Sequence, residues 1–286
     1  MVTPFDRKGN LDLKRTTRLV EYLIEHGSDS LLVAGTTGES ATLSTEEKLA
    51  LFAHVVKVAA GRVPVIAGTG TYDTHATVEL TKKAEKTGIN GILAVTPYYI
   101  KPNQEGMYRH FETIAKSTDL PVMLYNIPGR SVVNMNAETI IRLARIENIT
   151  AVKEASGNLD QITEIIRETD DDFALYSGDD GLTLPIMAVG GTGVVSTSAN
   201  IIGREMRQMI LAYTRGEVTE AAAAHRRLLP LMRALFAAPS PAPVKTALQM
   251  MGMDVGGVRL PLVPLNEEER LALQRVLHTT IPSEQF

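Results

Sequence analysis

Short apolar segments recur along this chain, and a stretch with the periodicity of an amphipathic helix follows each of them. Continuous apolar runs without alternation are typical of parallel strands that are buried on both faces. Successive segments begin about 20 to 33 residues apart, which is the spacing of strand–helix units. We predict strands over Ser30–Gly35, Val63–Gly68, Gly91–Val95, Pro121–Asn126, Thr150–Ala155, Phe173–Gly178 and Gly193–Ser196.

Helix-start and helix-end signals fill the intervals between these segments. Ser44 and Glu47 form a capping box at the start of one predicted helix. Seven strand–helix units, with the opening fragment MVTPF as an eighth strand, predict an α/β protein with a (β/α)8 TIM-barrel fold. The main competitor is an open doubly wound sheet, but no glycine-rich dinucleotide fingerprint follows the first strands.

The pattern changes after about residue 216, where strand signals cease and an alanine- and leucine-rich helix begins. The segment PSPAP over Pro239–Pro243 interrupts this helical region, and further helical stretches follow it. We therefore predict two domains, a barrel over residues 1–215 and a C-terminal all-helical extension over residues 216–286.

Composition and net charge exclude several classes of function. With 44% hydrophobic residues among 286, the chain can bury a substantial core, and the absence of cysteine excludes disulfides, thiolate metal sites and a cysteine nucleophile. The net charge is −4 without long blocks of either sign, which disfavours nucleic-acid and membrane-surface binding. No apolar run is long enough to cross a bilayer and no secretory signal opens the sequence, so we expect a cytoplasmic protein that acts on a small molecule.

One lysine lies inside an apolar strand. In the sequence ITAVKEA, Lys153 is surrounded by residues expected to be buried. Burial disfavours the ammonium form and leaves a neutral amine, which can attack a carbonyl carbon and form a Schiff base. The alternative is a lysine whose long stem reaches solvent between helices. The strand pattern alone leaves both interpretations open.

Other reactive groups follow neighbouring strands, at the end of a barrel where active sites lie. Thr36 and Thr37 stand between glycines, in a loop suited to a carboxylate or phosphate or simply in a tight turn. Tyr99 and Tyr125 could pack at the rim or relay protons, and Tyr125 and Thr36 fit a proton relay by position. Arg130 follows a Pro-Gly turn and could be a carboxylate fork or a solvated charge.

Other chemistries find less support. The six histidines are scattered over predicted helices without ligand spacing, which disfavours a catalytic zinc site. Asp179 and Asp180 could bind magnesium, but helix capping is the simpler use. The serines near strand ends lack a neighbouring histidine and acid, so a serine-hydrolase triad is disfavoured.

Six motifs occur in a characteristic order along the chain: GTTGES, VTPYY, YNIPGR, AVKEASG, SGDD and GVVS. Through them, and over essentially its whole length, the sequence resembles the 4-hydroxy-tetrahydrodipicolinate synthase (dihydrodipicolinate synthase) family. This family belongs to the pyruvate-dependent class I aldolase superfamily, which includes N-acetylneuraminate lyase. The resemblance implies a lyase that condenses pyruvate with L-aspartate-4-semialdehyde, at the entry to diaminopimelate and lysine biosynthesis.

The resemblance also implies roles for single residues. Lys153 would form the imine with pyruvate, so that no metal or organic cofactor is needed. Tyr125 would be the general acid/base, with Thr36 and Tyr99 completing the proton relay. In the family this last tyrosine comes from a neighbouring subunit, which implies a homotetramer built as a dimer of dimers. Substrate binding would fall to Thr37 for the pyruvate carboxylate, to Val195 and Gly178, and to Arg130 for the carboxylate of the aldehyde.

Two departures from the family pattern are visible. Relative to other members, we expect either a shortened first strand or a start at an internal methionine, and the lysine-feedback pocket is only partly matched. Thr45, Lys48 and Ala76 stand where sensitive members offer imidazole or carboxylate groups. We therefore predict weak or absent inhibition by L-lysine, which an inhibition constant in the low micromolar range would contradict.

The sequence leaves two rival functions. A sister aldolase would act on N-acetylneuraminate or a 2-keto-3-deoxy sugar acid, but Arg130 argues for an aldehyde that carries a carboxylate. A barrel that binds a keto acid without catalysis is the other alternative, and the intact Lys153, Tyr125 and Thr36 positions argue against it.

Overall fold

The computed structural model describes residues 1–281 and falls into two compact units. The first unit joins residues 1–65 to the C-terminal residues from 197 onwards, and the second comprises residues 66–196. Seven strands occur in the described chain, and each begins and ends within two residues of the bounds predicted from the sequence. They are β1 Leu31–Val33, β2 Val65–Gly68, β3 Gly91–Val95, β4 Val122–Asn126, β5 Ile149–Glu154, β6 Ala174–Ser177 and β7 Gly193–Val194.

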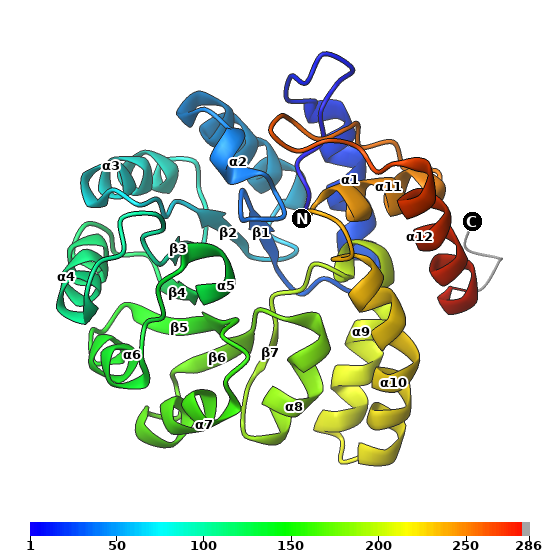
Figure 1. Cartoon of the computed structure of the whole chain (residues 1–286). Helices are drawn as coiled ribbons and strands as arrows, with labels where there is room; N and C mark the ends of the chain where they lie inside the picture. Colours follow the sequence, from blue (N-terminus) through cyan, green and yellow to red (C-terminus); the bar gives the residue numbers. More distant parts are fainter. Residues whose placement is uncertain (282–286) are drawn as a thin grey trace. The chain divides into compact units, whose positions relative to one another are not determined.

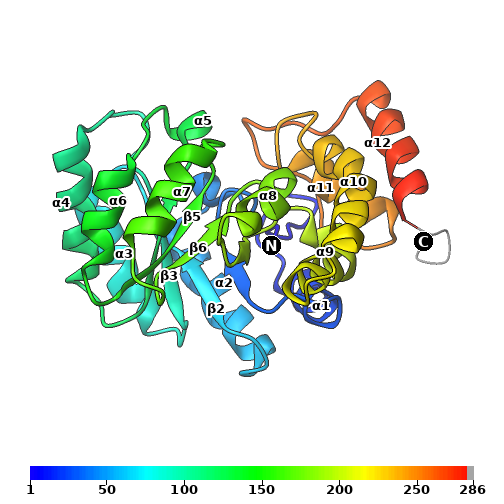
Figure 2. The same cartoon turned by 90° about the horizontal axis from the view of Figure 1, so that it is seen from below.

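In the second unit each strand pairs in parallel with the next strand along the chain, from β2 to β7. Figure 1 shows these strands side by side in sequence order, with α3, α4, α6, α7 and α8 outside them and α5 nearer the centre, and the turned view in Figure 2 places α4 and α6 on the same outer side. This arrangement buries the strands on both faces, which explains their continuous apolar sequences. The helices are α3 Thr74–Glu85, α4 Gln104–Ala115, α5 Pro128–Ser131, α6 Ala137–Ala144, α7 Leu159–Glu168 and α8 Thr183–Ala188.

The first unit is mainly helical. Its second helix begins with the capping box predicted at Ser44 and Glu47, in which both reciprocal hydrogen bonds are present. In the C-terminal part, α10 packs against α9 and α12, and α11 packs against α9 and α12. No helix among the described residues is long and apolar enough to span a membrane. The helices are α1 Leu13–Glu25, α2 Thr45–Ala59, α9 Ala199–Thr214, α10 Val218–Ala234, α11 Ala242–Met250 and α12 Glu267–Thr280.

The turn around Gly216 separates α9 from α10, as the change in sequence pattern indicated. The division into a barrel over residues 1–215 and a helical domain over residues 216–286 stays a prediction.

The fragment MVTPF, for which we predicted an eighth strand, is not among the strands of residues 1–281. Phe5 makes only an isolated antiparallel bridge with Leu11. The Val2 N–H donates to the Asn200 side chain at 3.2 Å, and the Phe5 N–H donates to the Val255 carbonyl at 3.0 Å. The Met1 amino group also donates to the Leu32 carbonyl of β1 at 2.9 Å. The donors of this fragment therefore go to a strand, a helix and a loop, and the fragment does not form a strand in the described chain.

One buried histidine in the second unit makes stability depend on pH. His110, on α4, is 4% exposed, and its Nδ1 lies 2.8 Å from the Thr74 hydroxyl. Its Nε2 is buried without a hydrogen-bond partner. Burial lowers the pKa of His110 from 6.5 to about 4, with Asp73 acting weakly in the opposite direction. The imidazole is therefore neutral in the folded protein at pH 7.

We expect acid to destabilise the protein through this residue. Because the folded pKa lies below the unfolded one, the contribution is complete above pH 6.5 and is lost as the pH falls towards 4. The loss is about 2 to 3 kcal/mol by pH 4.5, from roughly 1.4 kcal/mol for each pKa unit. Urea unfolding at pH 7 and pH 4.5 should show a smaller loss for His110→Leu than for the wild type. An equal loss in both proteins would contradict this assignment.

Candidate functional site

The lysine singled out in the sequence lies beside a tyrosine on the adjacent strand. Lys153 on β5 is directly opposite Tyr125 on β4 in the parallel register. Side chains alternate along a strand, so the two residues share one face of the sheet. The Lys153 Nζ lies 4.2 Å from the centroid of the Tyr125 ring. Both side chains are buried, with Lys153 7% exposed, so the alternative of a lysine that reaches solvent between helices is wrong.

A glycine leaves room for the stem of this lysine. Gly178 directly follows β6, and its N–H donates to the Glu154 carbonyl at 2.7 Å. A Cβ atom on Gly178 would lie 3.1 Å from Lys153 Cε and 2.8 Å from Ala155 Cβ. Any larger residue at position 178 would therefore push on Lys153. Val195 directly follows β7, and its N–H donates to the Ser177 carbonyl at 2.9 Å.

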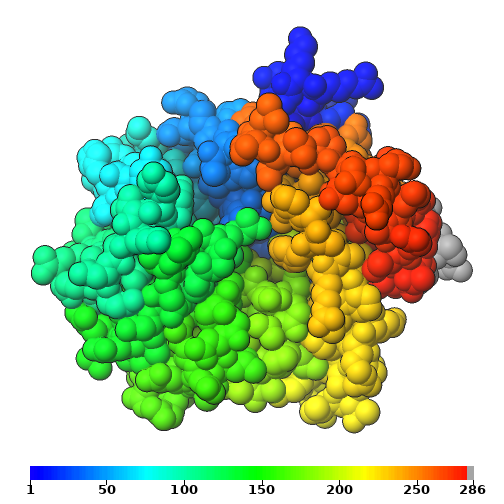
Figure 3. Space-filling model, viewed as in Figure 1, coloured from blue at the N-terminus to red at the C-terminus, as the bar shows by residue number. Residues whose placement is uncertain are grey.

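Two predicted site residues of the second unit are exposed. Tyr99 follows β3 in a left-handed backbone conformation with φ 72°, and its side chain is 88% exposed. Arg130 lies on the short helix α5, which reaches the surface that faces the viewer in Figure 3. Within residues 1–281 neither side chain makes a hydrogen bond or an ion pair with another residue. No hydrogen bond or ion pair among the described residues therefore joins Tyr99 or Arg130 to Lys153.

The two predicted threonines lie in the first unit, in the loop that follows β1. This loop is a tight turn in which the Glu39 N–H donates to the Thr36 carbonyl at 3.0 Å. The Thr37 hydroxyl lies 3.0 Å from the hydroxyl of Thr197. At Gly38, a Cβ atom would lie 3.1 Å from the Cα of Ala34, which explains the glycine in the GTTGES motif.

A buried ion pair under this loop was not foreseen from the sequence. Glu39 Oε1 lies 2.7 Å from the Nζ of Lys245 on α11, and both side chains are at most 2% exposed. The Nζ also donates to the Gly257 carbonyl at 2.7 Å and lies 4.1 Å from the Phe5 ring centroid. Burial lowers the pKa of Lys245 to about 8, while Glu39 acts in the opposite direction. The sequence signal was a lysine inside the apolar segment PAPVK.

A buried polar cluster directly behind Lys153 and Tyr125 was also missed. Asn126 and Glu154 are the next residues on β4 and β5, they face each other in register, and both are fully buried. Asn126 Nδ2 donates to Glu154 Oε2 at 3.0 Å, and Gln161 Nε2 donates to the same oxygen at 3.1 Å. Polar residues at the end of otherwise apolar strands were the available signal.

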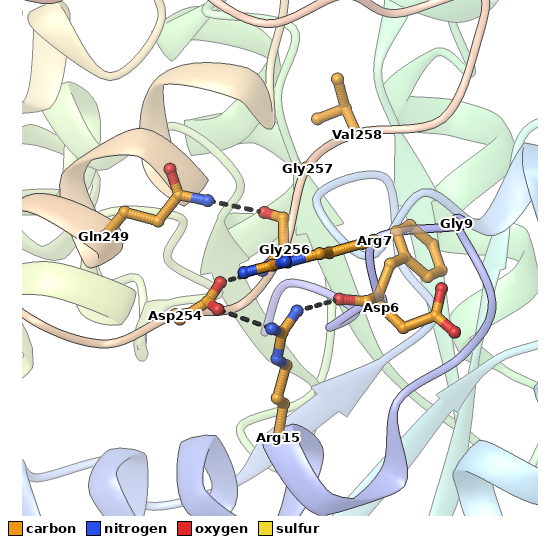
Figure 4. Close-up of a pocket in the computed structure, with 10 residues that line it drawn as sticks. Asp6, Arg7, Gly9, Arg15, Gln249, Asp254, Gly256, Gly257 and Val258 are labelled. Carbon is orange, nitrogen blue, oxygen red and sulfur yellow. Dashed lines mark hydrogen bonds and ion pairs between the residues drawn. The ribbon is translucent and has the colours of Figure 1, made fainter.

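A cavity of about 290 Å³ lies in the first unit, and no predicted site residue is among those that line it. Figure 4 shows Arg15 inside it, donating to the Phe5 carbonyl at 2.5 Å and pairing with Asp254 at 2.6 Å. Gln249 donates to the Gly256 carbonyl at 3.0 Å. The guanidinium is thus already paired with oxygen atoms of the protein, and we assign no function to this cavity.

No three histidine, aspartate or glutamate side chains of residues 1–281 come together as a metal site. The Asp179 side chain accepts from the Gly181 N–H, as the predicted cap of a short 3-10 helix over Asp180–Leu182.

A family model identifies the chain. The model described as "Dihydrodipicolinate synthetase family" matches residues 1–280. The chain belongs to this family. The family and the lyase class predicted from the sequence are confirmed.

Individual members of the dihydrodipicolinate synthetase family agree over nearly the whole chain. A 4-hydroxy-tetrahydrodipicolinate synthase of Bacillus velezensis is 63% identical over 277 residues, which cover 97% of this chain and 96% of that protein. A crystal structure of a dihydrodipicolinate synthase from Bacillus anthracis is 58% identical and matches with a TM-score of 0.97, covering 99% of this chain and 96% of that one. A structure described as a monomeric dihydrodipicolinate synthase variant is 42% identical with a TM-score of 0.95, covering 98% of this chain and 94% of that one. The predicted fold class, a (β/α)8 TIM barrel with a C-terminal helical extension, is confirmed.

Proposed function

We propose that this member of the family condenses pyruvate with L-aspartate-4-semialdehyde to form 4-hydroxy-tetrahydrodipicolinate, a step of diaminopimelate and lysine biosynthesis. The observation that carries the proposal is the buried amine of Lys153 beside the phenol ring of Tyr125. The names of the full-length relatives support the choice of substrates.

The chemistry begins at Lys153. Its amine attacks the keto carbon of pyruvate after giving up a proton, and loss of water from the carbinolamine gives an imine. Removal of a methyl proton then gives an enamine, whose carbon attacks the aldehyde carbon of the second substrate. The amino group of the semialdehyde next attacks the imine carbon, which closes the ring and releases Lys153. These steps need proton transfers but no redox change, so an amine and hydroxyl groups suffice.

The other predicted residues supply proton transfer and binding in this proposal. Tyr125 is the general acid/base, and Thr36 with Tyr99 completes the hydroxyl relay. Thr37 binds the pyruvate carboxylate, with Val195 and Gly178 shaping the same site, and Arg130 binds the carboxylate of the semialdehyde.

The assembly and location belong to the same proposal. The strong exposure of Tyr99 suits a residue that acts in a neighbouring subunit, and we propose a homotetramer in the cytoplasm that uses no metal or organic cofactor. Because one related structure is described as monomeric, light scattering of the purified protein is the direct test.

Two assays on the wild-type protein test the proposed reaction. The protein is incubated with pyruvate and reduced with borohydride, and its peptides are weighed; a pyruvate-derived adduct on Lys153 is expected. A condensation assay with aspartate semialdehyde is then compared with cleavage of N-acetylneuraminate and of a 2-keto-3-deoxy sugar acid. Faster turnover of either sugar acid would assign the chain to the sister activity, and absence of any adduct would refute an aldolase.

Tyr125→Phe should slow turnover and leave the fold intact. The ring that lies over Lys153 is retained and only the hydroxyl is lost, so packing is preserved. General acid/base groups typically contribute about 10² to 10⁴ in rate, and we expect kcat to fall within that range. Steady-state kinetics and a thermal melt measure the two effects. A kcat within threefold of the wild type would exclude Tyr125 from proton transfer.

A further inference from the structure

The residues behind the Lys153–Tyr125 pair form one buried hydrogen-bond cluster in the second unit. Asn126 and Glu154 follow the pair on β4 and β5, so their side chains point to the opposite face of the sheet. Both are fully buried. A fully buried carboxylate needs several hydrogen bonds or a cation, because taking its charge out of water is costly.

Glu154 obtains those hydrogen bonds from neutral groups. Its Oε2 accepts from Asn126 Nδ2 at 3.0 Å and from Gln161 Nε2 at 3.1 Å, and its Oε1 accepts from the Ser156 N–H at 2.6 Å. No cation in the described part of the chain forms an ion pair with it. An ionised carboxylate can only accept, so Glu154 forces both amides to present their NH₂ groups to it.

The orientation of Asn126 lets it form hydrogen bonds with the far end of the segment that follows it, residues 127–134. With its NH₂ group towards Glu154, Asn126 directs Oδ1 to the Met135 N–H at 3.0 Å. The second hydrogen of its Nδ2 goes to Asn134 Oδ1 at 2.8 Å. Gln161 accepts from Asn134 Nδ2 at 2.8 Å and so holds the same end of the segment. Residues 127–134 thus form a loop whose two ends are joined through Asn126.

This loop carries Arg130. The arginine lies on the four-residue helix α5, is exposed, and makes no side-chain hydrogen bond or ion pair within residues 1–281. Inside the loop, the buried Ser131 hydroxyl shares its one hydrogen between the Ile127 carbonyl at 2.9 Å and the Val133 carbonyl at 3.0 Å, which links the start of the loop to its end. Because the Arg130 side chain has no hydrogen bond or ion pair to fix it, we infer that the joined ends of the loop determine its position.

We propose that Glu154 is a positioning residue for the second substrate: it orients Asn126, which closes the loop that presents Arg130 to the carboxylate of the semialdehyde. The inference rests on the proposed function and extends it, since Glu154 touches no reacting atom. Lys153 and Tyr125 occupy the other face of the same two strands, so imine formation with pyruvate does not depend on the loop. Loss of the Glu154 carboxylate should therefore weaken recognition of the semialdehyde selectively.

The test uses Glu154→Gln in the full-length protein, with Glu164→Gln as the matched control on the exposed side of α7. A glutamine at position 154 has an NH₂ group in place of one carboxylate oxygen, and this group cannot accept a hydrogen bond from the N–H donors around it. Asn126 must therefore either rotate its amide or lose a hydrogen-bond partner. We expect the KM for aspartate semialdehyde, at saturating pyruvate, to rise about tenfold or more. The rate of borohydride-trapped adduct formation with pyruvate and the KM for pyruvate should stay within twofold. The control should match the wild type in every measurement.

A double-mutant cycle with Arg130→Ala separates positioning from a general structural role. If Glu154 acts through Arg130, Glu154→Gln should raise the KM for the semialdehyde little further once Arg130 is absent. Equal multiplicative effects in both backgrounds, or a parallel loss of adduct formation, would overturn the proposal. If Glu154→Gln does not fold, Asn134→Ala is used in its place, because it removes the exposed side chain of the same cluster. It should also raise the KM for the semialdehyde and leave adduct formation with pyruvate unchanged. A wild type without condensation activity refutes the proposed function itself, and the inference with it.

Discussion

Replacing Lys153 with alanine should abolish the pyruvate adduct and lower kcat/KM for condensation by at least about 10⁴-fold, the scale on which loss of a covalent nucleophile acts. The amine is the atom that bonds to the keto carbon, and no other side chain in the second unit offers one beside Tyr125 among the described residues. Truncation removes a buried stem next to Gly178, so a modest loss of stability is expected as well. Borohydride trapping followed by peptide mass analysis is the decisive measurement.

Lys83→Ala provides the control for this variant. Lys83 lies exposed on α3, so its loss should leave both trapping and turnover at the wild-type level. An adduct that persists in Lys153→Ala, on whichever lysine it is found, would show that the Schiff base forms elsewhere.

Lys245→Met should destabilise the folded protein by about 3 to 5 kcal/mol, because breaking a buried ion pair leaves the partner charge uncompensated. Glu39 would remain in an interior where its carboxylate is 1% exposed. The methionine cannot replace the hydrogen bond that Lys245 makes to the Gly257 carbonyl. At roughly 2 to 4 °C for each kcal/mol, the Tm should fall by about 10 °C, which differential scanning calorimetry can measure.

Two comparisons test the origin of that loss. The double variant Glu39→Gln with Lys245→Met removes both charges, and its Tm should recover much of the difference. Arg215→Met breaks an exposed pair with Glu217 and should leave the Tm within about 2 °C of the wild type. If Lys245→Met melts like Arg215→Met, the buried pair has no special role in stability.

Much of the fold could be predicted because its signals are local. The strand segments were recognisable from continuous apolar runs, and all seven predicted segments are strands in the structure. The capping box at Ser44 and Glu47 was found from two residues at a fixed spacing. The fragment MVTPF has the apolar composition of a strand, yet its backbone donors bond to residues as distant as Asn200, which no local pattern reveals.

The candidate site, like the fold, could be predicted from the sequence only in part. Lys153 was conspicuous as a charge inside an apolar strand, and Tyr125 ends the preceding strand. The strand–helix pattern implied that their two strands are adjacent and parallel, whereas the register that places the two residues opposite each other comes from the structure. The roles of Thr36, Tyr99 and Arg130 came from resemblance to a family, because a hydroxyl or an arginine after a strand has several ordinary uses.

By itself, the sequence determined the order of the seven strands and the helices between them, the family, and Lys153 as the candidate for a Schiff base. Only the tertiary structure decided how the buried charges are satisfied, with Glu39 paired to Lys245 and Glu154 held by the amides of Asn126 and Gln161. The reason is physical. Strand and helix propensities act over a few residues, whereas the partner of a buried charge is chosen by packing between segments far apart in the chain, and any of several polar residues could have served.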